Sequence, residues 1–229
     1  MKQQNTAAFT LIELLVVISI IAILAALAVP ALTNALTKGQ LTGTMNNARQ
    51  LYLAGFQMAT DGAANSDPNY SWPGDGTPPS SLADYCTKLV QNDYLKPGDL
   101  QKILNAPGAA CTVATTAGAS GGSSSVRLSG TSALKVYLVQ DVNPSNTIFA
   151  ATTNFVYNSA LNAADVPYGD KGFVIIRKGG DAGTFKRNQA TAPTGGSGPA
   201  AYQASIGRMP GDTEGTLGSE GSNVLIQKQ

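Results

Sequence analysis

An uninterrupted apolar segment near the N-terminus limits how this chain can fold more than any other feature. Between Glu13 and Lys38 the sequence has 24 positions without a charged residue, and they are rich in Leu, Ile, Val and Ala. A helix of about 20 such residues is long enough to cross a bilayer. The chain is therefore expected to enter a membrane, and the acidic Glu13 inside the run from residue 7 to residue 32 needs an explanation.

The composition favours a protein without catalytic chemistry. The 229 residues include no histidine, which removes the usual general base and metal ligand. The formal net charge is +1 and the basic residues are dispersed, so no nucleic-acid-binding surface is indicated. No serine and lysine stand at a recognisable spacing for a nucleophile and its base. We therefore expect a chain that is not an enzyme.

A long helix is predicted from Phe9 to about Met58, apolar on all sides at first and amphipathic afterwards. Pro30 lacks an amide donor and its ring clashes with the carbonyl four residues earlier, so a kink or local opening is expected near Ala26. In the second half, apolar residues recur three or four positions apart and can pack against a globular body. These positions are Leu41, Met45, Ala48, Tyr52, Phe56 and Ala59.

The next segment predicts short helices separated by polar loops. A loop rich in Gly and Pro follows Asp61. Ser81 and Asp84 resemble a capping box, which predicts a helix that ends near Leu95. A further short helix is predicted around residues 100 to 104.

The last part of the chain predicts an antiparallel sheet. A linker rich in Gly, Ser, Thr and Ala is expected at 114–125, and a tail rich in Gly, Ser and Pro at 191–222. Runs of β-branched and aromatic residues predict strands, and a short apolar run after the tail predicts an edge strand. The three strand-like runs are 126–142, 147–158 and 172–178, and the edge strand is expected at 224–227.

The order of features at the N-terminus is specific. A polar leader with one positive charge, Lys2, is followed by the sequence Phe-Thr-Leu-Ile-Glu-Leu at residues 9–14 and then by the apolar run that contains Pro30. This order resembles the prepilin leader of type IV pilins and type II secretion pseudopilins. The resemblance covers about the first 30 residues closely and the amphipathic continuation loosely.

The resemblance implies an α+β, pilin-like fold, in which a long N-terminal helix with a transmembrane first half packs on a small antiparallel-sheet head. It also implies a single-pass protein of the bacterial inner membrane, with its head in the periplasm until a filament assembles. The implied segments are a leader at 1–8, a transmembrane helix and filament core at 9–36, an amphipathic continuation at 37–60, and a periplasmic head with flexible Gly/Ser-rich segments at 61–229.

The resemblance also assigns roles to residues. A prepilin peptidase would cut between Ala8 and Phe9, and the new amino group of Phe9 would be methylated. The family usually has glycine where this chain has Ala8, the nearest substitute in size. Glu13 would then pair with the Phe9 amine, in its own helix or in an adjacent subunit during assembly. Pro30 has two readings, a tolerated membrane-helix proline or a point where the helix loosens in the fibre.

The implied partners are those of filament assembly. They are other copies of the chain or other pilin-like subunits, the prepilin peptidase, an inner-membrane platform protein and an assembly ATPase, and nucleic-acid binding is not expected. A type II secretion pseudopilin is favoured, because the mid-chain position of the two cysteines differs from the pilin habit of a disulfide around a C-terminal region. A type IV pilin for adhesion, motility or DNA uptake is the alternative.

The two cysteines, Cys86 and Cys111, lie 25 positions apart without the spacing of a zinc site. If the head is exported they can form a disulfide, which would stabilise the fold by about 3.5 kcal/mol in the chain-entropy model. The alternative is two unrelated buried thiols.

Calcium is the one cofactor for which candidate ligands exist, although the spacing of an EF-hand loop is absent. Major pseudopilins use calcium in a C-terminal loop, but no residue here is matched to that site. Solvated loop carboxylates are the favoured reading of all the candidates. They are Asp61, Asp67 and Asp75 in one Gly-rich loop, and Asp212 and Glu214 in the tail.

Three other readings remain open. Ala26, Leu27 and Ala28 form a signal-peptidase site, and cleavage there would release a secreted protein that begins at Val29. A membrane-tethered binding protein is a further alternative, in which Tyr70 and Trp72 bind a carbohydrate or a partner instead of pinning a loop. A modest basic patch for DNA, or else a solvated strand end and turn, is formed by Arg177, Lys178, Lys186 and Arg187.

Overall fold

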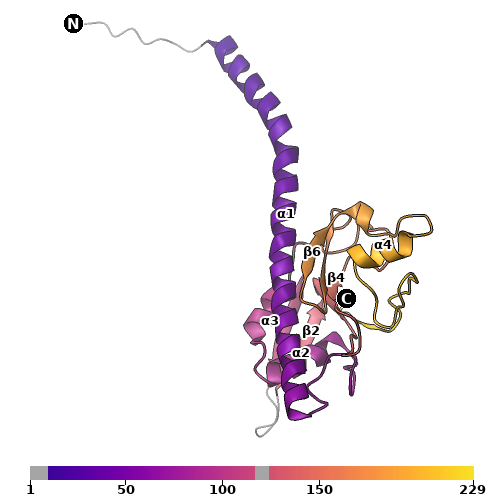
Figure 1. Ribbon diagram of the computed structural model, residues 1–229. Helices are drawn as coiled ribbons and strands as arrows, with labels where there is room; N and C mark the ends of the chain where they lie inside the picture. Colours follow the sequence, from indigo (N-terminus) through magenta and orange to yellow (C-terminus); the bar gives the residue numbers. More distant parts are fainter. Residues whose placement is uncertain (1–9, 117–123) are drawn as a thin grey trace. The chain divides into compact units, whose positions relative to one another are not determined.

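The computed structural model describes residues 10–116 and 124–229, and these form an α+β fold. A long helix, α1 (Leu11–Asn65), leads into a head with small sheets and three shorter helices (Figure 1). Two compact units divide between Gly39 and Gln40, inside α1.

The first unit is the N-terminal half of α1, and its apolar side chains are exposed. Every residue from 10 to 36 is exposed, with Leu27 at 74% and Ile12 at 70%. The helix stays continuous through Ala26 and Pro30, so the expected local opening is absent from this described stretch. Figure 1 shows this half of the helix as a smooth curve, which spreads the effect of the missing proline amide over several turns.

The second half of α1 buries one face in the head, much as the spacing predicted. Four of the six predicted positions are buried and Met45 is half-buried, but Phe56 is 46% exposed, so the prediction for Phe56 was wrong. The buried face of the helix lies slightly to one side of Phe56. It includes residues that the predicted three- and four-residue spacing left out, such as Leu51, Gly55 and Met58. The buried residues of the helix are Leu41, Thr44, Ala48, Leu51, Tyr52, Ala54, Gly55, Met58, Ala59 and Gly62.

Two glycines of α1 allow the head to approach the helix backbone closely. A Cβ atom at Gly62 would lie 1.4 Å from the carbonyl oxygen of Tyr70, and one at Gly55 would lie 2.3 Å from the Tyr85 hydroxyl oxygen. Neither contact tolerates a side chain. Glycine has a low helix propensity, but Gly55 and Gly62 are required here because the packing leaves no room for a side chain.

The short helices agree with the predicted start signals. In α2 (Leu82–Gln91) the Ser81 side chain accepts a hydrogen bond from the Asp84 amide at 3.1 Å, which confirms the predicted N-cap. The second short helix, α3 (Pro97–Ile103), begins three residues earlier than predicted because Pro97 is suited to the first helical turn.

A two-stranded sheet lies beside these helices. It pairs β1 (Cys111–Thr116) with β2 (Ser125–Gly130) in antiparallel register, Cys111 opposite Gly130. The linker predicted at 114–125 was therefore wrong at both ends, since β1 extends to Thr116 and β2 begins at Ser125. The three threonines and Val113 of β1 suit a strand, but the Gly/Ser-rich sequence that follows obscured this signal.

The main sheet has five strands in the order β6-β5-β4-β3-β7, with each neighbouring pair antiparallel. The predicted run 126–142 is divided between the two sheets, because Gly130 has a positive φ of 87° and ends β2. The edge strand predicted near the C-terminus is confirmed as β7. The strands are β3 (Leu134–Tyr137), β4 (Ile148–Thr152), β5 (Phe173–Arg177), β6 (Ala182–Phe185) and β7 (Val224–Leu225).

Three of these strands are buried at nearly every position and build the core of the head. The stacked rings of Phe155 and Phe173, 4.4 Å apart, extend this core. The sequence did not predict β1, β6 or helix α4 (Gly198–Ser205). Helix α4 lies in the segment predicted as a tail, and the 3-10 turn that precedes it, η2 (Arg187–Gln189), was not predicted either.

Candidate functional site: an N-terminal assembly segment and a buried ion pair

The first turn of α1 holds Glu13 by a capping box. A carboxylate oxygen of Glu13 accepts hydrogen bonds from the Thr10 amide at 2.8 Å and from the Thr10 hydroxyl at 2.7 Å. The Glu13 amide donates to the Thr10 hydroxyl oxygen at 3.3 Å. The spacing Thr-x-x-Glu before an apolar run is the sequence signal for this motif, and the sequence reading missed it. Glu13 therefore has a local structural role in addition to any role in assembly.

The segment that follows is long and apolar enough to cross a membrane, with a mean hydropathy of 3.0 in its most apolar window. This fits a membrane anchor and leaves Glu13 at one end of the apolar surface. Ala8 and Phe9, the predicted cleavage and methylation positions, lie outside the described residues. Their roles remain predictions.

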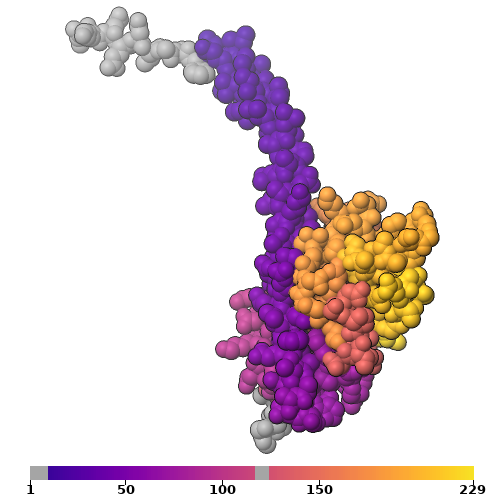
Figure 2. Space-filling model, viewed as in Figure 1, coloured from indigo at the N-terminus to yellow at the C-terminus, as the bar shows by residue number. Residues whose placement is uncertain are grey.

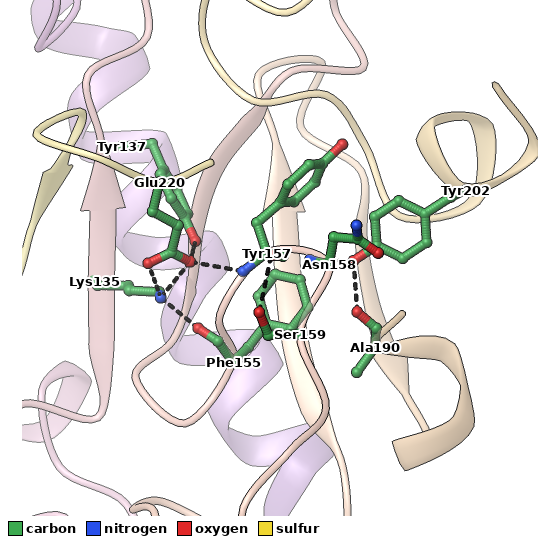
Figure 3. A network of polar contacts seen from close by, with 9 residues as sticks. All are labelled: Lys135, Tyr137, Phe155, Tyr157, Asn158, Ser159, Ala190, Tyr202 and Glu220. Atoms are coloured by element: carbon green, nitrogen blue, oxygen red, sulfur yellow. Dashed lines mark hydrogen bonds and ion pairs between the residues drawn. The ribbon is translucent and has the colours of Figure 1, made fainter. Parts of the chain in front are cut away.

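The head contains a second carboxylate in apolar surroundings, Glu220, and here the partners come from the same chain. Glu220 lies in the segment between α4 and β7, and it faces Lys135 and Tyr137 of β3 (Figure 3). The Lys135 ammonium contacts its two carboxylate oxygens at 2.6 Å and 2.8 Å. The Tyr137 hydroxyl donates at 2.7 Å and the Tyr157 amide at 3.0 Å.

Burial decides the chemistry of this network. The Lys135 side chain is 1% exposed and the Glu220 side chain 13%. Burial lowers the pKa of Lys135, and Glu220 opposes that shift. Burial together with Glu220 raises the pKa of Tyr137 well above its ordinary value. Lys135 also donates to the Phe155 carbonyl oxygen and lies 6.0 Å from the centre of that ring. The network fastens the C-terminal segment to the main sheet.

The same close-up shows a second group of polar contacts beside the ion pair (Figure 3). The Tyr202 hydroxyl of α4 donates to the Ala190 carbonyl at 2.8 Å and accepts from the Asn158 amide at 3.0 Å. Burial raises the pKa of Tyr202 to about 12. These contacts hold α4 against the loop after β4, so the segment predicted as a tail is part of the head.

The structure does not bring the five calcium candidates together. Among the described residues, no group of three or more Asp, Glu or Cys side chains is placed to hold a metal ion. Each candidate has a partner in its own surroundings, such as Tyr94 for Asp61 at 2.7 Å and Arg208 for Glu214 at 2.5 Å. Asp212 accepts from the Gly218 amide at 3.0 Å.

The remaining two calcium candidates, Asp67 and Asp75, line one hollow together with Asp141. The carboxylates of both candidates already accept hydrogen bonds from backbone amides. Asp67 accepts from the Asn69 amide at 2.9 Å, and Asp75 accepts from the Asp141 amide at 2.7 Å. These contacts organise the loops around the hollow. The sequence reading did not anticipate that Asp141 lies beside the two candidates.

The cysteines are both buried free thiols in the structure. Cys86 lies in α2 and Cys111 begins β1. Burial raises the pKa of both thiols, and Cys111 adds to the rise at Cys86, so the two belong to the same region of the core. The disulfide remains a prediction.

The predicted basic patch is divided between two places. Arg177 donates to the carbonyl oxygens of Ser205 and Ile206 and thereby holds the C-terminal end of α4. Lys178 donates to the carbonyls of Asp141 and Asn143. These two residues of the patch have structural partners, which weakens the reading as a DNA-binding surface.

The two aromatic residues of the polar loop follow the structural reading. Trp72 is 7% exposed and packs near Phe56 and Phe149, with ring centres 6.0 Å from each. Tyr70 donates a hydrogen bond to the Asn92 side chain at 2.9 Å. Both residues pin the loop to the body of the head, which is the structural alternative to a binding role.

Together these features define a chain with a prepilin-type N-terminal helix and a self-contained α+β head. The chain matches the family described as the prokaryotic N-terminal methylation motif at residues 3–29, and so carries the prepilin motif of type IV pilins and pseudopilins. The motif supports a type IV pilin-like or pseudopilin subunit in general, processed by a peptidase and assembled with other pilin-like subunits. No curated protein and no solved structure matches the chain.

Proposed function

We propose that this chain is a structural subunit of a pilus-like helical filament, and more narrowly a type II secretion pseudopilin. The subunit waits in the inner membrane with its head in the periplasm. A prepilin peptidase cuts between Ala8 and Phe9, and a platform protein and a cytoplasmic ATPase then drive extraction into the fibre. The chain itself supplies the packing surfaces and no catalysis.

One observation carries the proposal: Glu13 lies within the matched motif, at the start of an exposed apolar helical surface. A carboxylate within a membrane helix costs on the order of 3 kcal/mol on insertion scales, so it is normally functional or paired. Cleavage before Phe9 creates an amine four residues from Glu13. An amine of an adjacent subunit gives the carboxylate a partner that exists only in the filament.

The apolar half of α1 provides the second support. Its side chains have lipid as their surroundings before assembly and other helices afterwards. Helix association in this setting relies on close packing, because the apolar surface is equally satisfied by lipid. The energy for extraction therefore comes from the assembly machinery, and the packing of helices keeps the product together.

The choice of the secretion pseudopilin rests on the cysteines. Cys86 and Cys111 lie in the α2 and β1 region, far in sequence from the C-terminal end. A type IV pilin with a surface fibre remains the alternative reading. Electron microscopy of overexpressing cells discriminates them, since long surface fibres favour the pilin.

The test of the general proposal is the mass of the mature N-terminus. The chain is expressed in full with a prepilin peptidase, and the N-terminal peptide is sequenced by mass spectrometry. A methylated Phe9 is the expected result. A mature protein that begins at Val29 would instead establish the secreted form, and an intact Met1 in membranes that process other prepilins would reject Ala8 as a cleavage residue.

A further inference from the structure

A hollow surface beside the last turns of α1 has no role in the network described above. Two adjoining hollows of about 320 Å³ and about 380 Å³ share the lining residues Ala59, Ala63, Trp72 and Asp141. Phe56 lines the larger one with 46% of its surface exposed. We call this surface the distal groove. Its floor is apolar and aromatic, which is unusual for an exposed surface unless something packs there.

The rim of the distal groove is acidic. Asp67, Asp75 and Asp141 all line it, and the Asp141 side chain is 85% exposed. Among the lining residues Lys178 is the cation. Its ammonium pairs with the Asp141 carboxylate at 3.8 Å, donates to two backbone carbonyl oxygens and lies 5.3 Å from the centre of the Trp72 ring, so one of the three carboxylates already has a counter-charge. The groove therefore keeps a negative balance, and it fits an apolar chain that ends in a positive charge.

The opposite end of the head carries side chains of this kind, with an apolar stem and a positive charge at the tip. Lys171, Lys186 and Arg187 are exposed, and Arg187 pairs with Asp170 at 2.6 Å, so the corner keeps a positive balance. We call these three residues the basic corner. It adjoins the start of the head, because Phe185 pairs with Phe173 in the sheet, and a Cβ at Gly172 would lie 3.1 Å from Leu41.

The two surfaces are separated along the helix. From Leu41 to Ala59, α1 advances about 27 Å at 1.5 Å per residue. Figure 2 shows the two ends of the head on one face, with the purple segment of the last turns of α1 at one end and the orange segment that includes β6 at the other. One head cannot join its own surfaces, so contact between them needs a second molecule.

We propose that the distal groove of one head receives the basic corner of a second copy of this chain. The Lys186 stem lies along Phe56 and Trp72, and its ammonium meets the carboxylates of the rim. Long basic side chains bury their apolar stems in this way while the charge stays at a polar edge. The inference rests on the proposed function, because it describes how neighbouring heads in the filament touch.

The contact joins two different surfaces, and this has a geometric consequence. Such a heterologous contact repeats without closing unless the rotation happens to complete a ring, so it generates an open helical array. Charge complementarity of this kind also fixes the register between neighbours and weakens as salt rises. A fibre built on α1 alone would lack this register between heads.

The test uses cysteine crosslinking of the full-length chain in cells that carry the assembly machinery. Val142, next to Asp141, is 86% exposed, and Asn188, next to the basic corner, is also exposed. The double variant Val142→Cys with Asn188→Cys, treated with a short bismaleimide, is expected to give a ladder of multimers. Either single variant is expected to stay monomeric, because the two positions belong to different ends of the head.

Charge exchange then tests the pairing itself. Adding Lys186→Glu is expected to reduce the ladder about tenfold, and adding Asp141→Lys to that variant is expected to restore most of it. The matched control is Lys96→Glu, an exposed lysine before α3 that lies outside both surfaces and is expected to leave the ladder unchanged.

The outcomes separate this inference from the proposed function. Filaments in the electron microscope without a ladder, or a ladder that ignores Lys186→Glu, overturn the contact and leave the filament subunit standing. Dimers from a single-cysteine variant show an isologous contact and also overturn it. The absence of filaments in processed wild-type protein rejects the proposed function, and the contact fails with it.

Discussion

Glu13 in the N-terminal half of α1 and Glu220 in the head both stand among apolar residues, but they differ in how their charge is balanced. Glu220 is enclosed, and Lys135, Tyr137 and the Tyr157 amide all donate to it. Glu13 is exposed, and its hydrogen bonds come from the amide and hydroxyl of Thr10, which carry no charge. The head supplies a counter-charge from its own chain, whereas the described helix supplies dipoles only.

The difference shows that the core of the head is complete within one chain, whereas the surface around Glu13 has no counter-charge among the described residues of its own helix. A buried carboxylate without a positive partner is costly, so the head is more stable when Lys135 enters the core with Glu220. Under the proposed function, the surface around Glu13 becomes enclosed in a membrane or a fibre, and a partner amine created by cleavage arrives after folding, when assembly encloses the helix.

The largest expected effect comes from removing the internal partner. Lys135→Met leaves Glu220 enclosed without its counter-charge, and the free energy of unfolding should fall by about 3–5 kcal/mol. Denaturant unfolding of the detergent-solubilised chain measures it through the fluorescence of Trp72, the single tryptophan. The double variant Lys135→Met with Glu220→Leu should recover much of the loss. Equal losses in the single and double variants would show that packing, not charge, is lost.

The corresponding change at the other carboxylate should affect assembly and leave folding intact. Glu13→Gln keeps a side chain that can accept from Thr10 and removes the charge, whereas Glu13→Ala removes both. If Glu13 needs an amine from a neighbour, both variants should insert normally and enter filaments about a hundredfold less often, equivalent to about 2.7 kcal/mol. Pelleted filaments and membranes are compared by immunoblot.

The glutamine variant decides between the two roles of Glu13. If Glu13→Gln assembles like the wild type while Glu13→Ala does not, the capping box is what assembly requires. The partner of Glu13 would then be Thr10 of the same chain. Glu13 and Glu220 would no longer differ in needing a group from another subunit.

Two glycines of α1 allow the same comparison between an enclosed and an open position without any charge. A Cβ atom at Gly62 would collide with the Tyr70 carbonyl, whereas at Gly43 it would meet nothing within 4 Å in the described structure. Gly62→Ala should therefore lower the free energy of unfolding by about 2 kcal/mol. Gly43→Ala should raise it by up to about 1 kcal/mol, because alanine favours the helix. Similar unfolding midpoints for the two variants would contradict the enclosed packing of Gly62.

The sequence predicted the fold best where one local signal decides the structure. The apolar run, the Ser81 cap and the buried strand centred on Ile175 each follow from periodicity or residue type alone. Strand β6 and helix α4 were missed because their Gly- and Ala-rich sequences form structure only against the rest of the head.

The candidate site shows the same limit. Glu13 was found because a charge in a long apolar run is visible in one dimension. Lys135 and Glu220 are 85 positions apart, and a lysine between apolar neighbours gives no local sign that it is paired inside the core. The Thr10 cap, by contrast, has a local signal, because Thr-x-x-Glu before an apolar run is typical of a capping box.

The last expected effect depends on pH and concerns Tyr202, which belongs to the enclosed surroundings of the head. Burial raises its pKa to about 12 in the folded chain, against about 10 when unfolded. The folded state keeps the proton longer, so the stabilisation is complete below pH 10 and is lost as pH rises through 12. At pH 11 this group should contribute about 1.4 kcal/mol less than at pH 9. Tyr202→Phe should reduce the difference between urea unfolding at pH 9 and at pH 11 by that amount. An unchanged difference would show that the Tyr202 hydroxyl is open to water, and that α4 is not fastened to the loop after β4.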